Sequence, residues 1–134
     1  MLSEAQRDRI ALLVRVLRSG EYKQGRKALR RRTGGFCCLG VACDVYLRST
    51  GDGEWEECSM NYQFRAGTGV GSQSYIPDAV RDWFGFPITD PIVVLDRVET
   101  NLTHANDFYF KNFEEIAAAI EETYLREEED GTPS

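Results

Sequence analysis

Two adjacent cysteines lie in the first third of the chain, and the single histidine comes much later. Cys37 and Cys38 follow a double glycine, where the sequence predicts the start of a helix. A helix N-terminus lowers the pKa of a thiol and offers backbone N–H groups to an oxyanion. His104 and Asn106 complete an order of nucleophile, base and orienting amide. One hypothesis is therefore a cysteine-dependent hydrolase or transferase that uses Cys37 or Cys38 with His104.

The surrounding sequence favours a structural role for these cysteines instead. They lie in the run FCCLGVACDVYL, residues 36–47, which is apolar nearly all round. Apolar surroundings oppose a thiolate. We therefore interpret Cys37 and Cys38 as buried core residues, and a non-enzymatic protein is the preferred reading. The four cysteines lack the paired C-x₂-C spacing of a structural zinc site, so neither a metal nor another cofactor is predicted.

The strongest basic cluster lies within residues 23–32, and a glycine-rich loop follows at residues 66–74. Guanidinium groups bind phosphates through paired hydrogen bonds, and glycine-rich loops can form a nest of N–H groups for a phosphate. The loop lacks the Lys-Ser/Thr ending of a Walker motif. Two alternatives are a basic face balanced by the acidic C-terminal helix and a mobile hairpin loop. The seven predicted ligand-binding residues are Lys27, Arg30, Arg31, Arg32, Gly67, Gly69 and Gly71.

The charge of the chain restricts its partners. The 134 residues carry a net charge of −6, which disfavours non-specific binding to nucleic acids or to membrane surfaces. Residues 1–48 have a net charge of +7 and residues 49–134 a net charge of −13. We therefore predict a small anionic nucleotide or a host protein as the partner, rather than duplex nucleic acid or a membrane. A homo-oligomer is compatible with this composition.

The elements that would position these residues are helices interspersed with short strands. Ser3 and Gln6 form a capping-box pattern, and the apolar spacing that follows predicts a first helix ending near Gly20. A short, weakly patterned helix is expected over residues 21–32 and a buried one over residues 36–47. Gly40 inside the latter costs about 1 kcal/mol relative to Ala, which indicates that another element packs closely against it.

The remaining two thirds of the chain predict shorter elements. We expect strand structure within residues 54–65, at 74–76 and at 92–95, and helices at 78–84 and, capped by Thr100, up to residue 106. Asn112 and Glu115 form a second capping box before the last helix. The predicted fold is α+β: a mainly helical single domain over residues 1–126 with a small antiparallel sheet, followed by a flexible acidic tail at 127–134.

Several segments together resemble a group of small uncharacterised proteins of bacteriophages, prophages and their actinobacterial hosts. The group shares a G-F/Y-C-C-L-G-V core, and the chain departs from it at Ala105, where such proteins often have Leu. The resemblance implies a phage-type, cytoplasmic setting but no particular activity. The segments that carry it are LRSGEYKQ at 17–24, GFCCLGV at 35–41, GEW at 53–55, PDAVRDWFG at 77–85, Asn106-Asp107 and FEEIAAAI at 113–120.

These observations lead to one preferred function. No signal-peptide pattern and no run of about 20 apolar residues is found, so a cytoplasmic protein is expected. We predict a phage-type, non-enzymatic binding protein that acts on a host factor. It would be an anti-defence protein that sequesters a nucleotide signal or binds a defence protein.

Overall fold

Two helix layers and a small sheet are stacked on one another in the computed structural model, which describes residues 2–126. The predicted tail at 127–134 lies outside the described residues. The elements, in chain order, are α1 (Glu4–Arg18), β1 (Arg30–Arg31), α2 (Cys38–Thr50), β2 (Glu54–Cys58), β3 (Asn61–Arg65), α3 (Asp78–Phe84), β4 (Ile92–Leu95), β5 (Val98–Asn101), α4 (Leu102–Asp107) and α5 (Phe113–Tyr124). This content confirms the predicted α+β class.

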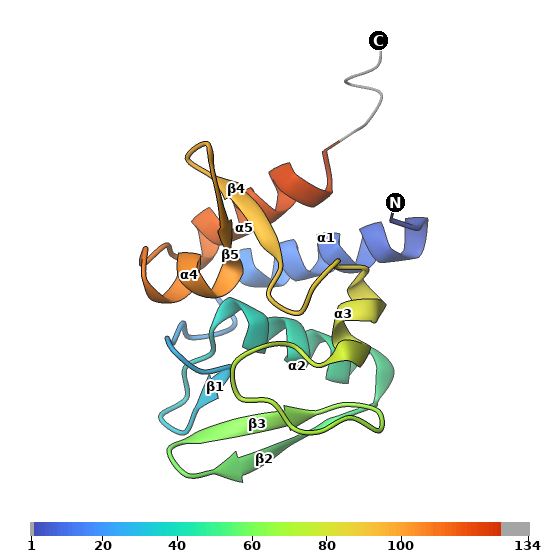
Figure 1. Ribbon diagram of the computed structural model, residues 1–134, viewed down its shortest axis with the longest axis vertical. Coiled ribbons are helices and arrows are strands. Elements are labelled where there is room, and N and C mark those ends of the chain that lie inside the picture. The colour runs from blue at the N-terminus through green and yellow to red at the C-terminus, as the bar shows by residue number, and fades with distance from the viewer. Residues whose placement is uncertain (1, 127–134) are drawn as a thin grey trace.

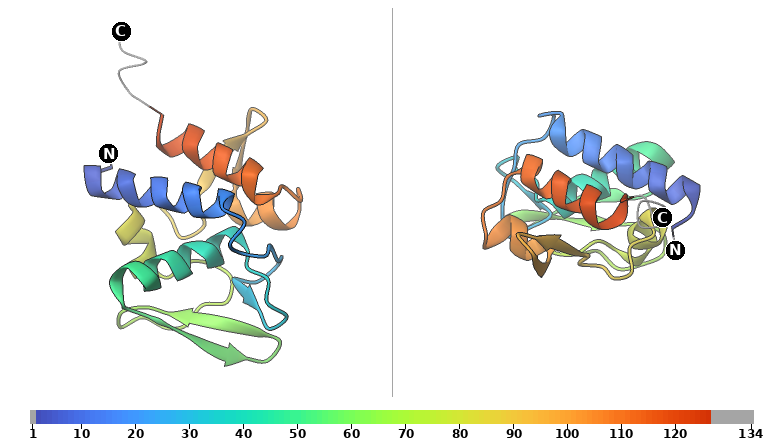
Figure 2. Two further views of the ribbon diagram at one scale, coloured as in Figure 1. Left: turned by 180° about the vertical axis from the view of Figure 1, so that it is seen from behind. Right: turned by 90° about the horizontal axis from the view of Figure 1, so that it is seen from above.

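Helix α2 is the central layer. Helices α1 and α5 lie side by side above it, and the antiparallel sheet in the order β1-β3-β2 lies below it (Figures 1 and 2). A separate hairpin of β4 and β5 packs against α5. One continuous apolar core joins these layers, with α2 supplying its largest share. Burial of nearly the whole circumference of α2 explains why residues 36–47 lack an amphipathic pattern.

Both predicted capping boxes are confirmed. The Ser3 hydroxyl accepts a hydrogen bond from the Gln6 N–H, and the Gln6 side chain accepts one from the Ser3 N–H. Asn112 and Glu115 make the same reciprocal pair at the start of α5. These local signals therefore fix where α1 and α5 begin.

Gly40 is required by the close approach of α2 to the segment before β1. A Cβ atom at this position would lie 1.8 Å from the backbone oxygen of Leu29. The Cys37 N–H donates to that same oxygen at 3.1 Å. The close packing predicted from the sequence is thus confirmed, and the neighbour is backbone rather than a side chain.

The helix predicted over residues 21–32 is wrong. This segment is an extended loop: Gln24 bridges Phe36, and Arg30 pairs with Tyr62 in β3. Lys27 has a φ of 70°, which is incompatible with a right-handed helix. The segment has few apolar residues to bury along one helix face, so backbone pairing with distant segments determines its conformation.

Three further boundaries differ from the prediction. Residues 54–65 form two strands, β2 and β3, because Ser59 at a φ of 56° reverses the chain. The strand expected at 74–76 is absent, and Ser72 bridges Phe64 instead. Thr100 belongs to β5, a strand that the sequence analysis missed, and Asn101 takes the N-cap position of α4.

Candidate ligand-binding site

A buried polar network connects the loop before β1 to helix α4. Asn106 is fully buried; its amide donates to the Gly25 oxygen at 2.9 Å and to Asp107 Oδ1 at 2.8 Å. Gln24 Nε2 donates to Asn106 Oδ1 and to the Lys111 backbone oxygen. A buried polar group without a hydrogen-bond partner destabilises the fold. These hydrogen bonds therefore hold the loop before β1 in a fixed position relative to α4 and the residues that follow it. We call this network the clamp.

A pocket of about 310 Å³ lies beside the clamp, where four stretches of the chain meet. Small-molecule sites usually measure roughly 300–1,000 Å³ and combine apolar walls with a few converging polar groups. This one offers an ammonium, an imidazole, hydroxyl groups, a carboxylate and two aromatic rings. Its lining residues are Lys27, Ala28, Cys37, Ser74, Tyr75, Thr103, His104, Asp107 and Phe108.

Lys27 enters this pocket from a strained backbone. Its φ of 70° lies in the left-handed region, which costs a residue with a Cβ atom about 1–3 kcal/mol. The Lys27 N–H donates to Asp107 Oδ1 at 2.9 Å, so the buried carboxylate holds this conformation. The side chain ends with Nζ 5.8 Å from the centre of the Phe108 ring. A strained residue held by a buried group at a pocket is a typical feature of a functional site.

Three consecutive aromatic residues follow α4 and remain exposed. Phe108, Tyr109 and Phe110 are 59%, 56% and 66% exposed. The Phe108 ring meets His104 edge-on, and the Arg26 guanidinium lies 5.0 Å from the centre of the Phe110 ring. Adjacent exposed aromatic side chains of this size usually mark an interaction surface. We call residues 108–110 the aromatic loop.

Cys37 lines the pocket but is not poised as a nucleophile. Its thiol is only 3% exposed, and burial raises its pKa to about 12, although the backbone N–H groups of Gly40 and Leu39 at the start of α2 act in the opposite direction. The neutral thiol therefore dominates at physiological pH. This burial confirms the sequence interpretation of Cys37 as a core residue.

The other members of the hypothetical catalytic set do not assemble around Cys37. Cys38 is also buried, and its thiol donates to the Leu102 oxygen at 3.8 Å. The Asn106 side chain is engaged in the clamp rather than with His104. The structure thus brings Cys37 and His104 to one pocket, but within residues 2–126 they form no hydrogen bond with each other.

The predicted arginine cluster does not form one surface. The Arg30 guanidinium lies 4.2 Å from the centre of the Tyr62 ring, and Phe36 and Trp55 also flank it. Arg31 donates to the Arg26 backbone oxygen, and Arg32 pairs with Glu57 at 3.4 Å. These three side chains support local structure, whereas Lys27 alone among the predicted cations reaches the pocket described above.

Gly69 and Gly71 of the glycine-rich loop line a different pocket, of about 410 Å³, and Gly67 is not among its lining residues. The Gly67 N–H already donates to the Asp52 carboxylate, and the Gly69 N–H donates to the Ala66 oxygen. Two of the three glycine N–H groups are therefore occupied within the chain. The predicted basic and glycine residues do not converge on a common ligand.

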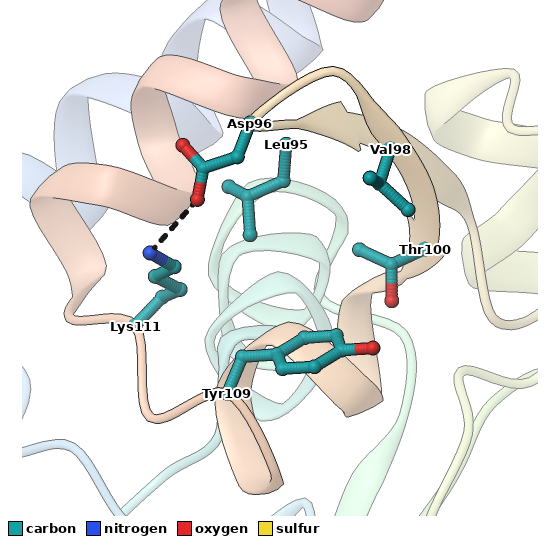
Figure 3. A pocket seen from close by; sticks show the side chains of 6 residues that line it. All are labelled: Leu95, Asp96, Val98, Thr100, Tyr109 and Lys111. Atoms are coloured by element: carbon teal, nitrogen blue, oxygen red, sulfur yellow. Dashed lines mark hydrogen bonds and ion pairs between the residues drawn. The ribbon is translucent and has the colours of Figure 1, made fainter.

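A third pocket, of about 280 Å³, is lined by Tyr109 of the aromatic loop (Figure 3). Tyr109 lies across it from Val98 and Thr100, and Leu95 forms part of its wall. The charges at its edge, Asp96 and Lys111, pair with each other at 3.2 Å. Because this pocket is apolar and its charged groups are paired, it is less suited to an anionic ligand than the pocket at Lys27.

The sequence analysis missed the aromatic side of the site. Phe108, Tyr109, Phe110 and Tyr75 were not singled out as candidates. The sequence does contain a signal for residues 108–110. Three consecutive aromatic side chains cannot all be buried on one face of a helix or strand, so at least one is expected to be exposed. Their proximity to Lys27 could not be inferred, since it depends on the clamp between segments about 80 residues apart.

Comparison with known proteins gives one match. A family model described as a domain of unknown function (DUF8296) matches residues 7–124. The chain belongs to the DUF8296 family. The match includes the clamp, the aromatic loop and every residue that lines the pocket at Lys27. No curated protein and no solved structure matches the chain.

Two structural findings bear on other site classes. Within residues 2–126, no group of three or more His, Cys, Asp or Glu side chains is arranged to hold a metal ion. In the same range, no helix combines the length and the apolar composition needed to cross a membrane.

Proposed function

We propose that the protein is a non-enzymatic binding protein whose pocket at Lys27 takes a small anionic nucleotide. The observation that carries this proposal is the placement of Lys27: an ammonium group on a strained backbone, held by the buried Asp107 and set beside the exposed Phe108 ring. The ammonium suits a phosphate and the rings of Phe108 and Tyr75 suit a base. In the phage-type, cytoplasmic setting that the sequence resemblance implies, such a protein would sequester a nucleotide signal of the host or bind a defence protein.

The charge pattern around the pocket supports an anion over a cation. Among residues 2–126, no ion pair of Lys27 or Arg26 with a carboxylate is found, whereas Arg18, Arg32 and Arg48 are paired. The single carboxylate in the pocket, Asp107, accepts hydrogen bonds from the Lys27 N–H and from Asn106. The positive charge at the entrance is therefore left for a ligand.

Calorimetric titration with the four ribonucleoside monophosphates tests this proposal. We expect binding that weakens as the salt concentration rises, because an exposed ammonium–phosphate contact is screened. Lys27→Gln and Phe108→Ala should each weaken it about tenfold, equivalent to about 1.4 kcal/mol. Arg15→Gln is the matched control, since it removes one exposed positive charge from α1, outside the pocket. The absence of heat with all four nucleotides, or equal affinity in Lys27→Gln, would leave a protein partner as the better explanation.

The cysteine-enzyme alternative shares this pocket and has its own test. Cys37 and His104 both line it, and this common location is the observation in its favour. The alternative predicts covalent capture of Cys37 by an electrophilic probe and loss of capture in His104→Ala. Because burial raises the pKa of the thiol to about 12, we expect no capture at neutral pH.

A further inference from the structure

Two cation–aromatic pairs join the loop before β1 to the aromatic loop, and the proposed function uses only one of them. Lys27 lies over Phe108, and Arg26 lies over Phe110. The cations are consecutive in one loop, and the rings are two positions apart in the aromatic loop. Tyr109, between the two rings, lines the other pocket instead (Figure 3). The surface thus repeats one unit, a positive charge beside an exposed ring.

Buried hydrogen bonds hold the two loops that carry this repeat. Asp107 holds the Lys27 N–H, and the Gln24 amide holds the Lys111 oxygen at the end of the aromatic loop. Phe110 has a φ of 54°, so its backbone, like that of Lys27, is kept in the left-handed region. Two exposed residues therefore have costly backbone conformations, and the buried network bonds to one of them, Lys27, and to Lys111, the residue after the other.

The Arg26 guanidinium contacts the Phe110 ring, but its hydrogen-bonding capacity is not fully used. Its Nε atom is buried without a hydrogen bond, and no carboxylate pairs with its guanidinium among the residues that the structure describes. A partly desolvated guanidinium attracts phosphate more strongly than a fully hydrated one. The second unit is consequently as well suited to an anion as the first.

From this repetition we propose that the ligand is a short single-stranded oligonucleotide of at least two nucleotides. The pocket at Lys27 and Phe108 takes one nucleotide, and Arg26 and Phe110 take the next phosphate and base. Stacking on aromatic side chains requires unpaired bases and tolerates any base, so a duplex would not fit. The net charge of −6 favours a short strand, because each further phosphate is repelled by the negative charge of the protein as a whole. This inference rests on the proposed function of the same site.

Fluorescence-detected titration with a labelled hexanucleotide single strand, together with competition by a mononucleotide, a dinucleotide and the same hexamer as a duplex, tests the inference. We expect the dinucleotide to bind about tenfold more tightly than the mononucleotide, and the duplex not to compete. Phe110→Ala should remove this gain and leave mononucleotide affinity unchanged. Tyr109→Ala is the matched control, because it removes an equally exposed ring that lines the other pocket.

The outcomes separate the two proposals. Equal affinity for mono- and dinucleotide, or a dinucleotide gain that survives in Phe110→Ala, would overturn the oligonucleotide inference while the mononucleotide proposal stands. No binding of any nucleotide would overturn both and would assign the aromatic loop to a protein partner. Loss of affinity in Tyr109→Ala equal to that in Phe110→Ala would also count against the inference, since the effect would then come from the loop as a whole.

Discussion

Lys27 shows how one residue can be unfavourable for the fold and useful for the site. Its positive φ would suit glycine, yet lysine occupies the position and its N–H is held by Asp107. Such strain is expected where the side chain has a role that glycine cannot fill. Substitution of Lys27 therefore tests whether this residue lowers the stability of the fold and strengthens ligand binding.

Lys27→Gly should stabilise the protein and weaken ligand binding about as much as Lys27→Gln does. Relief of the left-handed strain outweighs the lost contact with Phe108, so we expect the free energy of unfolding to rise by up to about 1 kcal/mol. Chemical denaturation followed by circular dichroism measures this change. Lys23→Gly is the control, because Lys23 is exposed on the same loop but has no positive φ, and it should lose about 0.5–1 kcal/mol. Destabilisation by Lys27→Gly would contradict the interpretation.

The thiol of Cys37 provides a pH-dependent prediction. Burial raises its pKa from the ordinary value of 9.0 to about 12. The unfolded chain titrates near the ordinary value, so the stability that depends on this neutral thiol is complete below pH 9 and is lost as the pH rises toward 12. Alkylation of native protein followed by mass spectrometry should modify Cys58, which is partly exposed, well before the buried Cys37, Cys38 and Cys43. Rapid modification of Cys37 near neutral pH would contradict this.

At the scale of elements, α2 depends on a position without a side chain. Glycine inside a helix normally costs about 1 kcal/mol relative to alanine, so Gly→Ala is often stabilising. At Gly40 the added methyl group would collide with the Leu29 backbone oxygen, which cannot rotate away as a side chain could. The close contact between α2 and the segment before β1 therefore requires glycine at position 40.

Gly40→Ala should lower the free energy of unfolding by about 3 kcal/mol, against the direction of helix propensity. Thermal and chemical unfolding measure this loss. Gly69→Ala is the control with the same chemical change: its Cβ would lie 3.5 Å from the Ala66 oxygen, an ordinary contact, and its effect should stay within about 0.5 kcal/mol. Similar effects of the two substitutions would show that the close approach does not decide the outcome.

A second element-scale connection fixes the sheet against α2. The Asp44 carboxylate accepts from the Tyr22 hydroxyl at 2.5 Å and from the Trp55 indole at 3.0 Å. The Tyr22 and Trp55 rings each meet Phe36 edge-on. One charged residue in an apolar run thus joins a loop, a helix and a strand, which explains why Asp44 interrupts residues 36–47.

On the scale of the whole molecule, ion pairs partly compensate the uneven charge. Arg18 of the basic first part pairs with Glu114 and Glu121 of the acidic second part, and Arg32 pairs with Glu57. The two parts therefore pack together and neutralise each other in these places. Lys27 and Arg26 lie outside these pairs, so their positive charge is not neutralised by the acidic second part.

The clamp joins two distant parts of the chain, the loop before β1 and helix α4, and the proposed site lies where they meet. Asn106→Ala would leave the Gly25 oxygen without its donor and the Gln24 amide with the Lys111 oxygen as its remaining partner, and we expect the free energy of unfolding to fall by about 2–4 kcal/mol. Hydrogen exchange should show faster exchange of the Lys27 and Lys111 amides than in the parent protein. Asn101→Ala is the comparison: its side chain donates one hydrogen bond, to the Asp90 oxygen, and its loss should be smaller. Unchanged exchange at Lys27 would show that the clamp does not hold the loop.

The sequence predicts correctly those elements that depend on interactions between residues close together in the chain. Two capping boxes positioned α1 and α5, an apolar run predicted the buried helix α2, and Gly40 indicated the close approach to it. The burial of Cys37 and Cys38 followed from the same run. In each case the reason lies within a few residues of the chain, in hydrogen bonds between near neighbours or in the apolar character of consecutive side chains.

Only the tertiary structure decided the loop over residues 21–32 and the site that it forms. Its conformation depends on pairing with Phe36 and Tyr62 and on hydrogen bonds to Asn106 and Asp107, which no local propensity encodes. The same long-range contacts separated Lys27 from Arg30 and brought it to Phe108. Residue types therefore lead to the hypothesis of an anion-binding site. Buried hydrogen bonds between segments about 80 residues apart determine which cation faces which ring.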